Sequence, residues 1–290
     1  MSDATDLDAL RDEIDRIDDQ LHDCLRRRTA LVGDIAAVKE RQAAADEAAT
    51  VYVNPGREAT VLRRRLDQHS GILPRAVVAR LWRELIGAFC HLQSPQRVLI
   101  HAPAKSVGYW DLARNHFGSV AAMSVHTSAQ RVLREVAEND RAIGLLTLPE
   151  DNETNPWWPQ VVAGHRARLF VVARLPFYTS ASGQFEDLAA LVVAPFAPQP
   201  SGDDVSLMAV ETGETSRARL GELMTDAGLK GHVIASYGDD DPGARLQLYE
   251  ATGFVGQDDD RVTALLNRHD SLVRRIIFLG AYAVPVGRLD

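Results

Sequence analysis

A regular series of apolar residues runs through the first forty positions and most constrains how this chain can fold. The series steps by four and three residues without a break, through Leu10, Ile14, Ile17, Leu21, Cys24, Arg28, Leu31, Ile35 and Val38. This spacing predicts one α-helix with a single apolar stripe, from about residue 6 to about residue 41. Such a helix is about 54 Å long at about 1.5 Å per residue, more than the diameter of a small domain. The stripe must therefore meet another long helix, most simply that of a second chain.

Arg28 is the one charged residue in this apolar series. A guanidinium keeps its proton, so in an apolar position it requires an anionic group beside it. Lys39 follows eleven residues later, about 20° from alignment with Arg28 and about 16 Å along the helix. Two long side chains can close this gap around a small dianion, with arginine as the carboxylate clamp and lysine as a point charge. The alternative is that Arg26–Arg28 is a solvated charge run and Lys39 complements the helix dipole.

Two further helices are expected before residue 95. Asn54 and Pro55 are typical of a helix N-cap and first position, and this helix should reach about Asp67. Its first turn carries Arg57 and Glu58, which ordinarily form a surface pair. A third helix should run from Pro74 to Ser94-Pro95, with a buried face at Val78, Leu81, Leu85, Ile86, Phe89 and Leu92.

Two polar residues on these helices invite a functional interpretation. Gln93 shares the apolar register of Ile86 and Phe89, and a buried amide must be hydrogen-bonded. Arg11 lies 17 residues before Arg28, about 25 Å along the axis. It could join a ligand held by Arg28 and Lys39 only from the partner chain.

The bulk properties exclude several classes of function. A net charge of -8 argues against a general nucleic-acid or lipid-surface protein. The acidic N-terminus does not resemble a secretory signal, and no apolar stretch reaches the roughly 18 residues of a membrane span. Cys24 and Cys90 are expected as reduced core thiols, which favours the cytosol. The histidines lack metal-ligand spacing and no dinucleotide or P-loop pattern appears, so no metal or cofactor is expected.

The pattern of apolar residues changes in the remainder of the chain. From residue 96, short apolar runs alternate with helical segments, as in an α/β domain. A linker rich in Pro, Gly and Asp is expected at 196–204. Beyond it the expected elements are strand, helix, strand, strand, helix and strand, at 206–212, 216–227, 232–237, 245–252, 260–268 and 275–284. That βαββαβ order predicts a ferredoxin-like fold, so the domains are expected at 1–95, 96–200 and 201–290.

The helical part resembles a known family. The segments LDALRDEIDRIDDQL, LRRRTALVGDIAAVK, VNPGREATVLRRRL and RLWRELIGAFCHLQ are similar to the all-helical class of chorismate mutases. The resemblance implies an intertwined homodimer in which Arg28, and Arg11 of the other protomer, hold the two carboxylates of chorismate. Lys39 and Gln93 would donate hydrogen bonds to the ether oxygen. Arg57 and Glu58 would lie beside the ring, and Glu58 would accept a hydrogen bond from the substrate hydroxyl. Asn54 stands where the family often has aspartate, and Phe89 where it often has a small hydroxyl residue; both would border the substrate.

The rest of the chain resembles other families less closely. Residues 96–195 are similar to part of a prephenate dehydratase domain, through VLIHAPAKSVGYWDLARNHFG and AIGLLTLPEDN. The family's glycine-threonine-phenylalanine-serine loop is absent, and its threonine-arginine-phenylalanine tripeptide is replaced in the stretch Ala173–Phe177, so this segment is expected to be inactive. Residues 205–286 resemble an ACT-type regulatory domain in element order, and the resemblance implies an aromatic amino-acid effector.

The leading hypothesis is therefore a cytoplasmic chorismate mutase of phenylalanine and tyrosine biosynthesis, dimeric or of higher order. A bifunctional mutase and dehydratase, and an isochorismate-pyruvate lyase, are enzyme alternatives. A non-enzyme alternative is a dimeric ligand-sensing protein in which Arg28 only sets the register of the helices. Neither nucleic acid nor membrane is expected as a partner.

Overall fold

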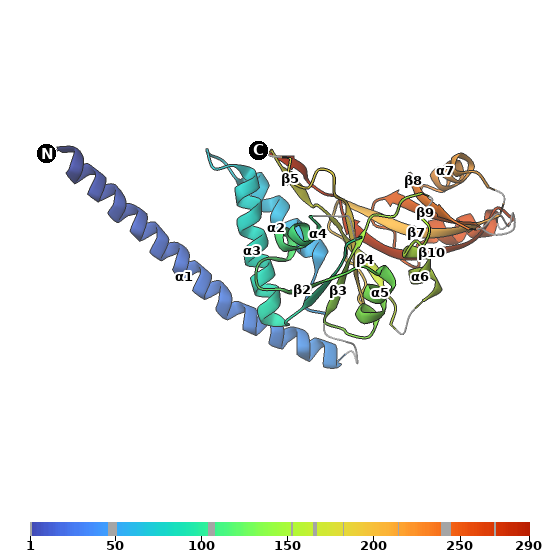
Figure 1. Cartoon of the computed structure of the whole chain (residues 1–290), viewed down its shortest axis with the longest axis horizontal. Coiled ribbons are helices and arrows are strands. Elements are labelled where there is room, and N and C mark those ends of the chain that lie inside the picture. The colour runs from blue at the N-terminus through green and yellow to red at the C-terminus, as the bar shows by residue number, and fades with distance from the viewer. Residues whose placement is uncertain are drawn as a thin grey trace. The chain divides into compact units, whose positions relative to one another are not determined.

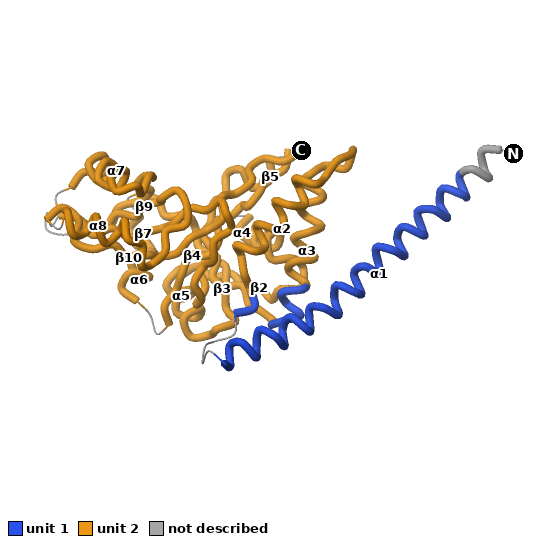
Figure 2. Tube along the Cα trace, turned by 180° about the vertical axis from the view of Figure 1, so that it is seen from behind, with its two compact units in different colours: residues 1–52, 89–94 blue, residues 53–88, 95–290 orange. Residues whose placement is uncertain are grey.

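The chain folds into two compact units. The computed structural model describes residues 2–45, 51–103, 108–151, 153–164, 167–181, 183–213, 215–238, 245–269 and 271–290. One unit contains residues 1–52 and 89–94, and the other contains residues 53–88 and 95–290 (Figure 2). The last turns of one helix therefore belong to the first unit while the rest of that helix belongs to the second.

The first unit is built on one long helix, α1 (Ser2–Ala45). The helix predicted for residues 6 to 41 is confirmed and extends further at both ends. The leucine, isoleucine and valine side chains of the stripe, from Leu10 to Val38, are 41% to 59% exposed in the single chain. Cys24 is itself exposed, so its assignment as a core thiol is wrong within one chain, and Cys90 is partly buried. No described helix is both long enough and apolar enough to cross a membrane.

Helices α2 (Pro55–Gln68) and α3 (Arg75–Gln93) follow the predicted boundaries closely. Asn54 caps α2, because its side chain accepts a bond from the backbone N–H of Arg57, and Pro55 takes the first helical position. The buried face of α3 is partly different from the prediction. Val78, Ile86 and Phe89 are buried, but Leu81 and Leu92 are 56% and 61% exposed. Ala79 and Arg83 occupy the buried positions instead.

A nine-stranded mixed sheet organises the second unit (Figure 1). Its strand order is β2-β1-β3-β6-β4-β10-β7-β9-β8. The strands of the first half are β1 (Arg97–His101), β2 (Ala122–His126), β3 (Ala142–Thr147), β4 (Phe170–Leu175) and β6 (Ala190–Ala194). The helices between them are α4 (Tyr109–Phe117), α5 (Ala129–Ala137) and α6 (Trp158–Ala163). The alternation of strands and helices predicted from residue 96 is confirmed.

The second half of the sheet has the predicted βαββαβ order. Its elements are β7 (Asp204–Thr212), α7 (Arg217–Asp226), β8 (Gly231–Tyr237), β9 (Arg245–Thr252), α8 (Asp260–Arg268) and β10 (Val273–Ala283). The antiparallel strand order β10-β7-β9-β8 is that of a ferredoxin-like sandwich. The expected domain limits at residues 95 and 200 stay predictions. Strands from both sides of position 200 belong to the same sheet.

The two halves of the sheet meet at one residue pair. Gly280 of β10 pairs in parallel with Val171 of β4, and it is the one pair recorded between these strands in the described residues. Gly280 has a φ of 141°, and a Cβ there would lie 2.0 Å from the carbonyl oxygen of Val171. Both the backbone angle and the close approach require glycine at this position.

Apolar clusters cover both faces of the sheet. Leu62 and Leu66 of α2 and Ala79 of α3 share one core with β1 and β4. On the other face, α5 packs with the fully buried Trp157 and Trp158. Helices α7 and α8 pack with β7 and β9 in a third cluster. A separate two-stranded sheet joins β5 (Tyr178–Ser180) to β11 (Gly287–Leu289) near the C-terminus.

Candidate active site

The first unit brings together four of the side chains singled out in the sequence. Arg28 projects from α1 onto Phe89 at the end of α3, with its Cζ 4.0 Å from the centre of the aromatic ring. Arg28 is partly buried, whereas its neighbours Arg26 and Arg27 are exposed. A guanidinium on a ring face is held by a cation–π attraction and keeps its N–H donors at its edge. Arg28 is therefore positioned by packing and is not part of a solvated charge run.

Lys39 lies on the same helix and contacts the end of α3. Its Nζ donates to Gln93 Oε1 at 3.4 Å and to the backbone oxygen of Tyr52 at 2.8 Å. Gln93 Nε2 in turn donates to the backbone oxygen of Phe89 at 3.3 Å. The prediction that the Gln93 amide is hydrogen-bonded is confirmed. Lys39 and Gln93 are thus coupled, and both are partly buried.

Tyr52 was not predicted to belong to this cluster. Its hydroxyl donates to Glu40 at 2.7 Å, and its ring centre lies 6.0 Å from Lys39 Nζ. Tyr52 therefore contacts α1 beside the lysine. The sequence carries no periodic signal for this contact, because Tyr52 lies outside any helix or strand.

Arg11 is not part of the cluster in this chain. It is exposed on α1 and forms an ion pair with Asp8, one turn away, at 3.2 Å. The 17 residues between Arg11 and Arg28 correspond to about 25 Å of continuous helix. A ligand on Arg28 cannot reach Arg11 of the same helix.

Asn54, Arg57 and Glu58 belong to the second unit, where each has a structural contact. Asn54 caps α2 through Oδ1 and donates from Nδ2 to Gln199 Oε1 at 2.5 Å. Arg57 is exposed. Glu58 accepts a hydrogen bond at 3.1 Å from Arg83, which is 2% exposed. The roles that the family resemblance implies for these three residues toward a substrate stay predictions.

Arg83 is a further buried cation that the sequence reading missed. Its Cζ lies 5.1 Å from the centre of the Phe177 ring, so it combines an ion pair with an aromatic contact. Burial and the Arg83 charge together lower the pKa of His116 well below its ordinary value. A sequence signal did exist, since Arg83 falls four residues after Ala79 and three before Ile86, in an apolar register like that of Arg28.

Arg63 of α2 fastens that helix to the start and end of the ferredoxin-like part. Its Nη1 donates to Ser201 Oγ at 3.1 Å, and its Nη2 donates to the backbone oxygens of Asp203 and Val284 at 2.9 and 2.6 Å. The segment predicted as a linker at 196–204 is therefore held against α2. Gly56 makes this possible, because a Cβ there would lie 2.4 Å from the backbone oxygen of Gln199.

The chemistry available to the first-unit cluster is electrostatic. It contains a guanidinium, an ammonium and an amide, with an aromatic ring beneath the guanidinium. Such a set can bind an anion and stabilise negative charge as it develops. Within the described ranges, no group of three or more His, Cys, Asp or Glu side chains is placed to hold a metal ion.

The family of chorismate mutase type II matches the chain over residues 10–94. These residues include Arg11, Arg28, Lys39 and Gln93 together with the capped start of α2. Residues 10–94 form a type II chorismate mutase domain. The resemblance seen in the sequence is confirmed, and with it the assignment of this domain to an isomerase family.

Two curated relatives extend the comparison beyond this mutase domain. The bifunctional chorismate mutase/prephenate dehydratases of Pseudomonas aeruginosa and Stutzerimonas stutzeri are 32% and 31% identical to the chain over 154 residues. The match covers 53% of this chain but 41% of each relative, so the chain spans about two fifths of their length. Among solved structures, prephenate dehydratase from Streptococcus mutans is 14% identical with a TM-score of 0.45, covering 67% of this chain and 99% of that one.

Proposed function

We propose that the protein is a chorismate mutase that rearranges chorismate to prephenate in the cytoplasm. The observation that carries the proposal is the joint placement of Arg28, Lys39 and Gln93 inside a domain of the chorismate mutase type II family. Chorismate carries two carboxylates and an ether oxygen, so it matches a site made of one guanidinium, one ammonium and one amide. No cofactor is required.

The proposed chemistry needs neither an acid, a base nor a nucleophile, because the rearrangement is intramolecular. The protein has to hold the enolpyruvyl arm over the ring and to place positive charge where the breaking C–O bond leaves negative charge. Arg28, stacked on Phe89, would clamp one carboxylate. Lys39 and Gln93, which already touch each other, would donate to the ether oxygen.

Phe89 acquires a definite role in this proposal. The family often has a small hydroxyl residue at this position, and the aromatic ring here supports the Arg28 guanidinium from below. A stacked arginine loses less conformational entropy when it binds a carboxylate, because it is already ordered. We expect Phe89 to shape the pocket without abolishing the reaction.

The proposal includes a homodimer formed through α1. The apolar stripe of α1 is about half exposed in the single chain, and a stripe of this length is typical of an association surface. A partner helix would cover it, and Arg11 of the partner would supply the second carboxylate contact. Asn54, Arg57 and Glu58 would complete the substrate site as the family resemblance implies.

The direct test is Arg28→Ala, assayed by the loss of chorismate absorbance with the product identified as prephenate. We expect turnover to fall by about 10²–10³-fold or more, as for other lost electrostatic contacts. Arg27→Ala is the matched control, since Arg27 is an exposed neighbour on the same helix. Full activity in Arg28→Ala, with circular dichroism unchanged, contradicts the proposal.

A mixing experiment tests the contribution of Arg11 from the partner. Arg11→Ala and Arg28→Ala homodimers are each expected to be inactive. When they are mixed and allowed to exchange subunits, half of the sites in each mixed dimer combine two intact arginines, so about a quarter of the wild-type activity should return. If no activity returns although mixed dimers form, Arg11 does not act across the dimer.

The alternative of a bifunctional mutase and dehydratase is favoured by the names of the two relatives. Against it stand the missing loop motif and the altered tripeptide in residues 173–177. We infer that the α/β part does not dehydrate prephenate, and that the ferredoxin-like part serves regulation, with an aromatic amino acid as the proposed effector. Formation of phenylpyruvate from added prephenate would reverse the first inference.

A further inference from the structure

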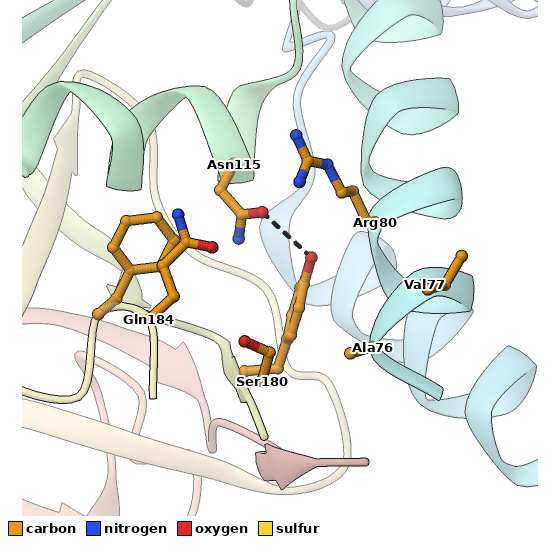
Figure 3. Close-up of a pocket in the computed structure, with 8 residues that line it drawn as sticks. Ala76, Val77, Arg80, Asn115, Ser180 and Gln184 are labelled. Carbon is orange, nitrogen blue, oxygen red and sulfur yellow. Dashed lines mark hydrogen bonds between the residues drawn. The ribbon is translucent and has the colours of Figure 1, made fainter. Parts of the chain in front are cut away.

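A small pocket in the second unit is lined by none of the residues assigned above to chorismate. It has a volume of about 220 Å³ and is formed by α3, α4, β5 and the turn that follows β5. Its lining residues are Ala76, Val77, Arg80, Asn115, Tyr178, Ser180, Gln184 and Phe185. Figure 3 shows the polar side chains of Arg80, Asn115, Ser180 and Gln184 converging from these different elements. The pocket therefore combines an apolar wall with a polar one.

Hydrogen-bond donors predominate on the polar wall. The Tyr178 hydroxyl donates to Asn115 Oδ1 at 3.3 Å (Figure 3), which leaves the Nδ2 group of this amide to face other partners. The structure records no described residue that accepts a bond from Asn115 Nδ2 or from the amide of Gln184. An amide nitrogen carries two donors, so these groups can satisfy the lone pairs of an anionic oxygen.

The charge at the pocket is positive. None of the eight lining residues is acidic. Across the described ranges, no carboxylate lies within ion-pair distance of Arg80, whose guanidinium extends toward Asn115 in Figure 3. Burial raises the pKa of Tyr178, while its bond to Asn115 and the charges of Arg83 and Arg80 act in the opposite direction. Two arginines thus act on the same hydroxyl, and an anion placed beside it would be attracted.

We propose that this pocket binds a small organic carboxylate that carries an apolar ring or a branched chain. Arg80 would hold the carboxylate, with Asn115 and Gln184 donating to its oxygens. The apolar part would lie against Val77 and Phe185. The volume is below the range of about 300–1,000 Å³ that is usual for drug-sized ligands, so the ligand is of metabolite size. This site is separate from the proposed mutase chemistry and does not depend on it.

Benzoate is the probe, and benzyl alcohol is its neutral counterpart. Isothermal titration of the full-length protein should give a dissociation constant of about 1 mM or below for benzoate, and at least tenfold weaker binding for the alcohol. Arg80→Gln should weaken benzoate binding by about tenfold or more, as expected for a lost charged hydrogen bond. Arg64→Gln is the matched control, because Arg64 is an exposed arginine of α2 outside the pocket.

The location of the bound probe must also be measured, since benzoate could bind the cations of the first unit. Methyl NMR signals of Ala76 and Val77 should shift on titration, and Arg28→Ala should bind benzoate as wild type does. Three results overturn the proposal: equal binding of benzoate and benzyl alcohol, unchanged binding in Arg80→Gln, or no shift of these methyl signals up to about 20 mM. None of these readouts uses chorismate turnover, so failure here is distinguishable from failure of the proposed function.

Discussion

The contacts of Arg63 make a strong prediction about what holds α2 in place. Its guanidinium donates to one hydroxyl and two backbone oxygens, at 3.1, 2.9 and 2.6 Å, and its side chain is 19% exposed. A hydrogen bond from a charged donor contributes about 1.5–3 kcal/mol. The backbone oxygen of Asp203 also accepts hydrogen bonds from the Val284 N–H and from Ser201 Oγ. It therefore keeps hydrogen-bond partners when the Arg63 guanidinium is removed. We therefore expect Arg63→Met to lower the free energy of unfolding by about 3 kcal/mol.

Urea denaturation followed by circular dichroism measures this change. With a slope of about 3 kcal/mol per molar urea, the midpoint should fall by about 1 M. Arg64→Met is the control, because Arg64 is the exposed neighbour on α2 and should change stability by less than about 0.5 kcal/mol. In the Arg63→Met background, Ser201→Ala should cost less than it does alone, since the two side chains share a bond. If Arg63→Met and Arg64→Met have equal midpoints, the contacts of Arg63 do not stabilise the fold.

Three smaller predictions concern other structural features. Because burial and Arg83 lower the folded-state pKa of His116, the unfolded chain binds this proton first, and the stability should fall as the pH decreases through the unfolded-state pKa of about 6.5. His116→Gln should abolish this pH dependence of the free energy of unfolding, measured by urea titration above and below pH 6.5. His269→Gln should preserve it. Asn54→Ala should cost about 1 kcal/mol through the lost helix cap, and Asn54→Asp, which keeps a cap, should cost less. Gly280→Ala should lower the melting temperature by several degrees through its clash with a backbone carbonyl, while Gly221→Ala, with open space inside α7, should raise it slightly; the reverse order would refute the sheet junction.

The sequence predicted local structure well, because local structure has local causes. The step of four and three residues predicted α1, and the Asn54-Pro55 pair predicted the start of α2. The misplaced residues of α3 show the limit of periodicity. Leu81 and Leu92 are apolar yet exposed, because the part of the helix surface that is buried depends on neighbours distant in sequence.

The pairing of strands that are distant in sequence could not be predicted from the sequence. Strands β5 and β11 pair although they lie more than a hundred positions apart, and no turn or residue spacing predicts this pairing. The same holds for the junction of Gly280 with Val171, which places the α/β half and the ferredoxin-like half in one sheet. In the candidate site, the residues on helical periods were predictable, namely Arg28, Lys39 and Gln93. Tyr52 was not, because it lies outside any helix or strand and has no periodic pattern to place it.

The core that α2 and α3 share with the sheet has a consequence for how this protein could be divided. The mutase family spans residues 10–94, yet α2 and most of α3 share a hydrophobic core with the sheet that follows. A fragment cut at residue 95 would leave Leu62, Leu66 and Ala79 uncovered, and it would tend to aggregate when expressed alone. The segment that the family delimits is therefore only partly a separate module here, because α2 and most of α3 belong to the core of the sheet. Recombination at that point would separate these side chains from the strands that bury them.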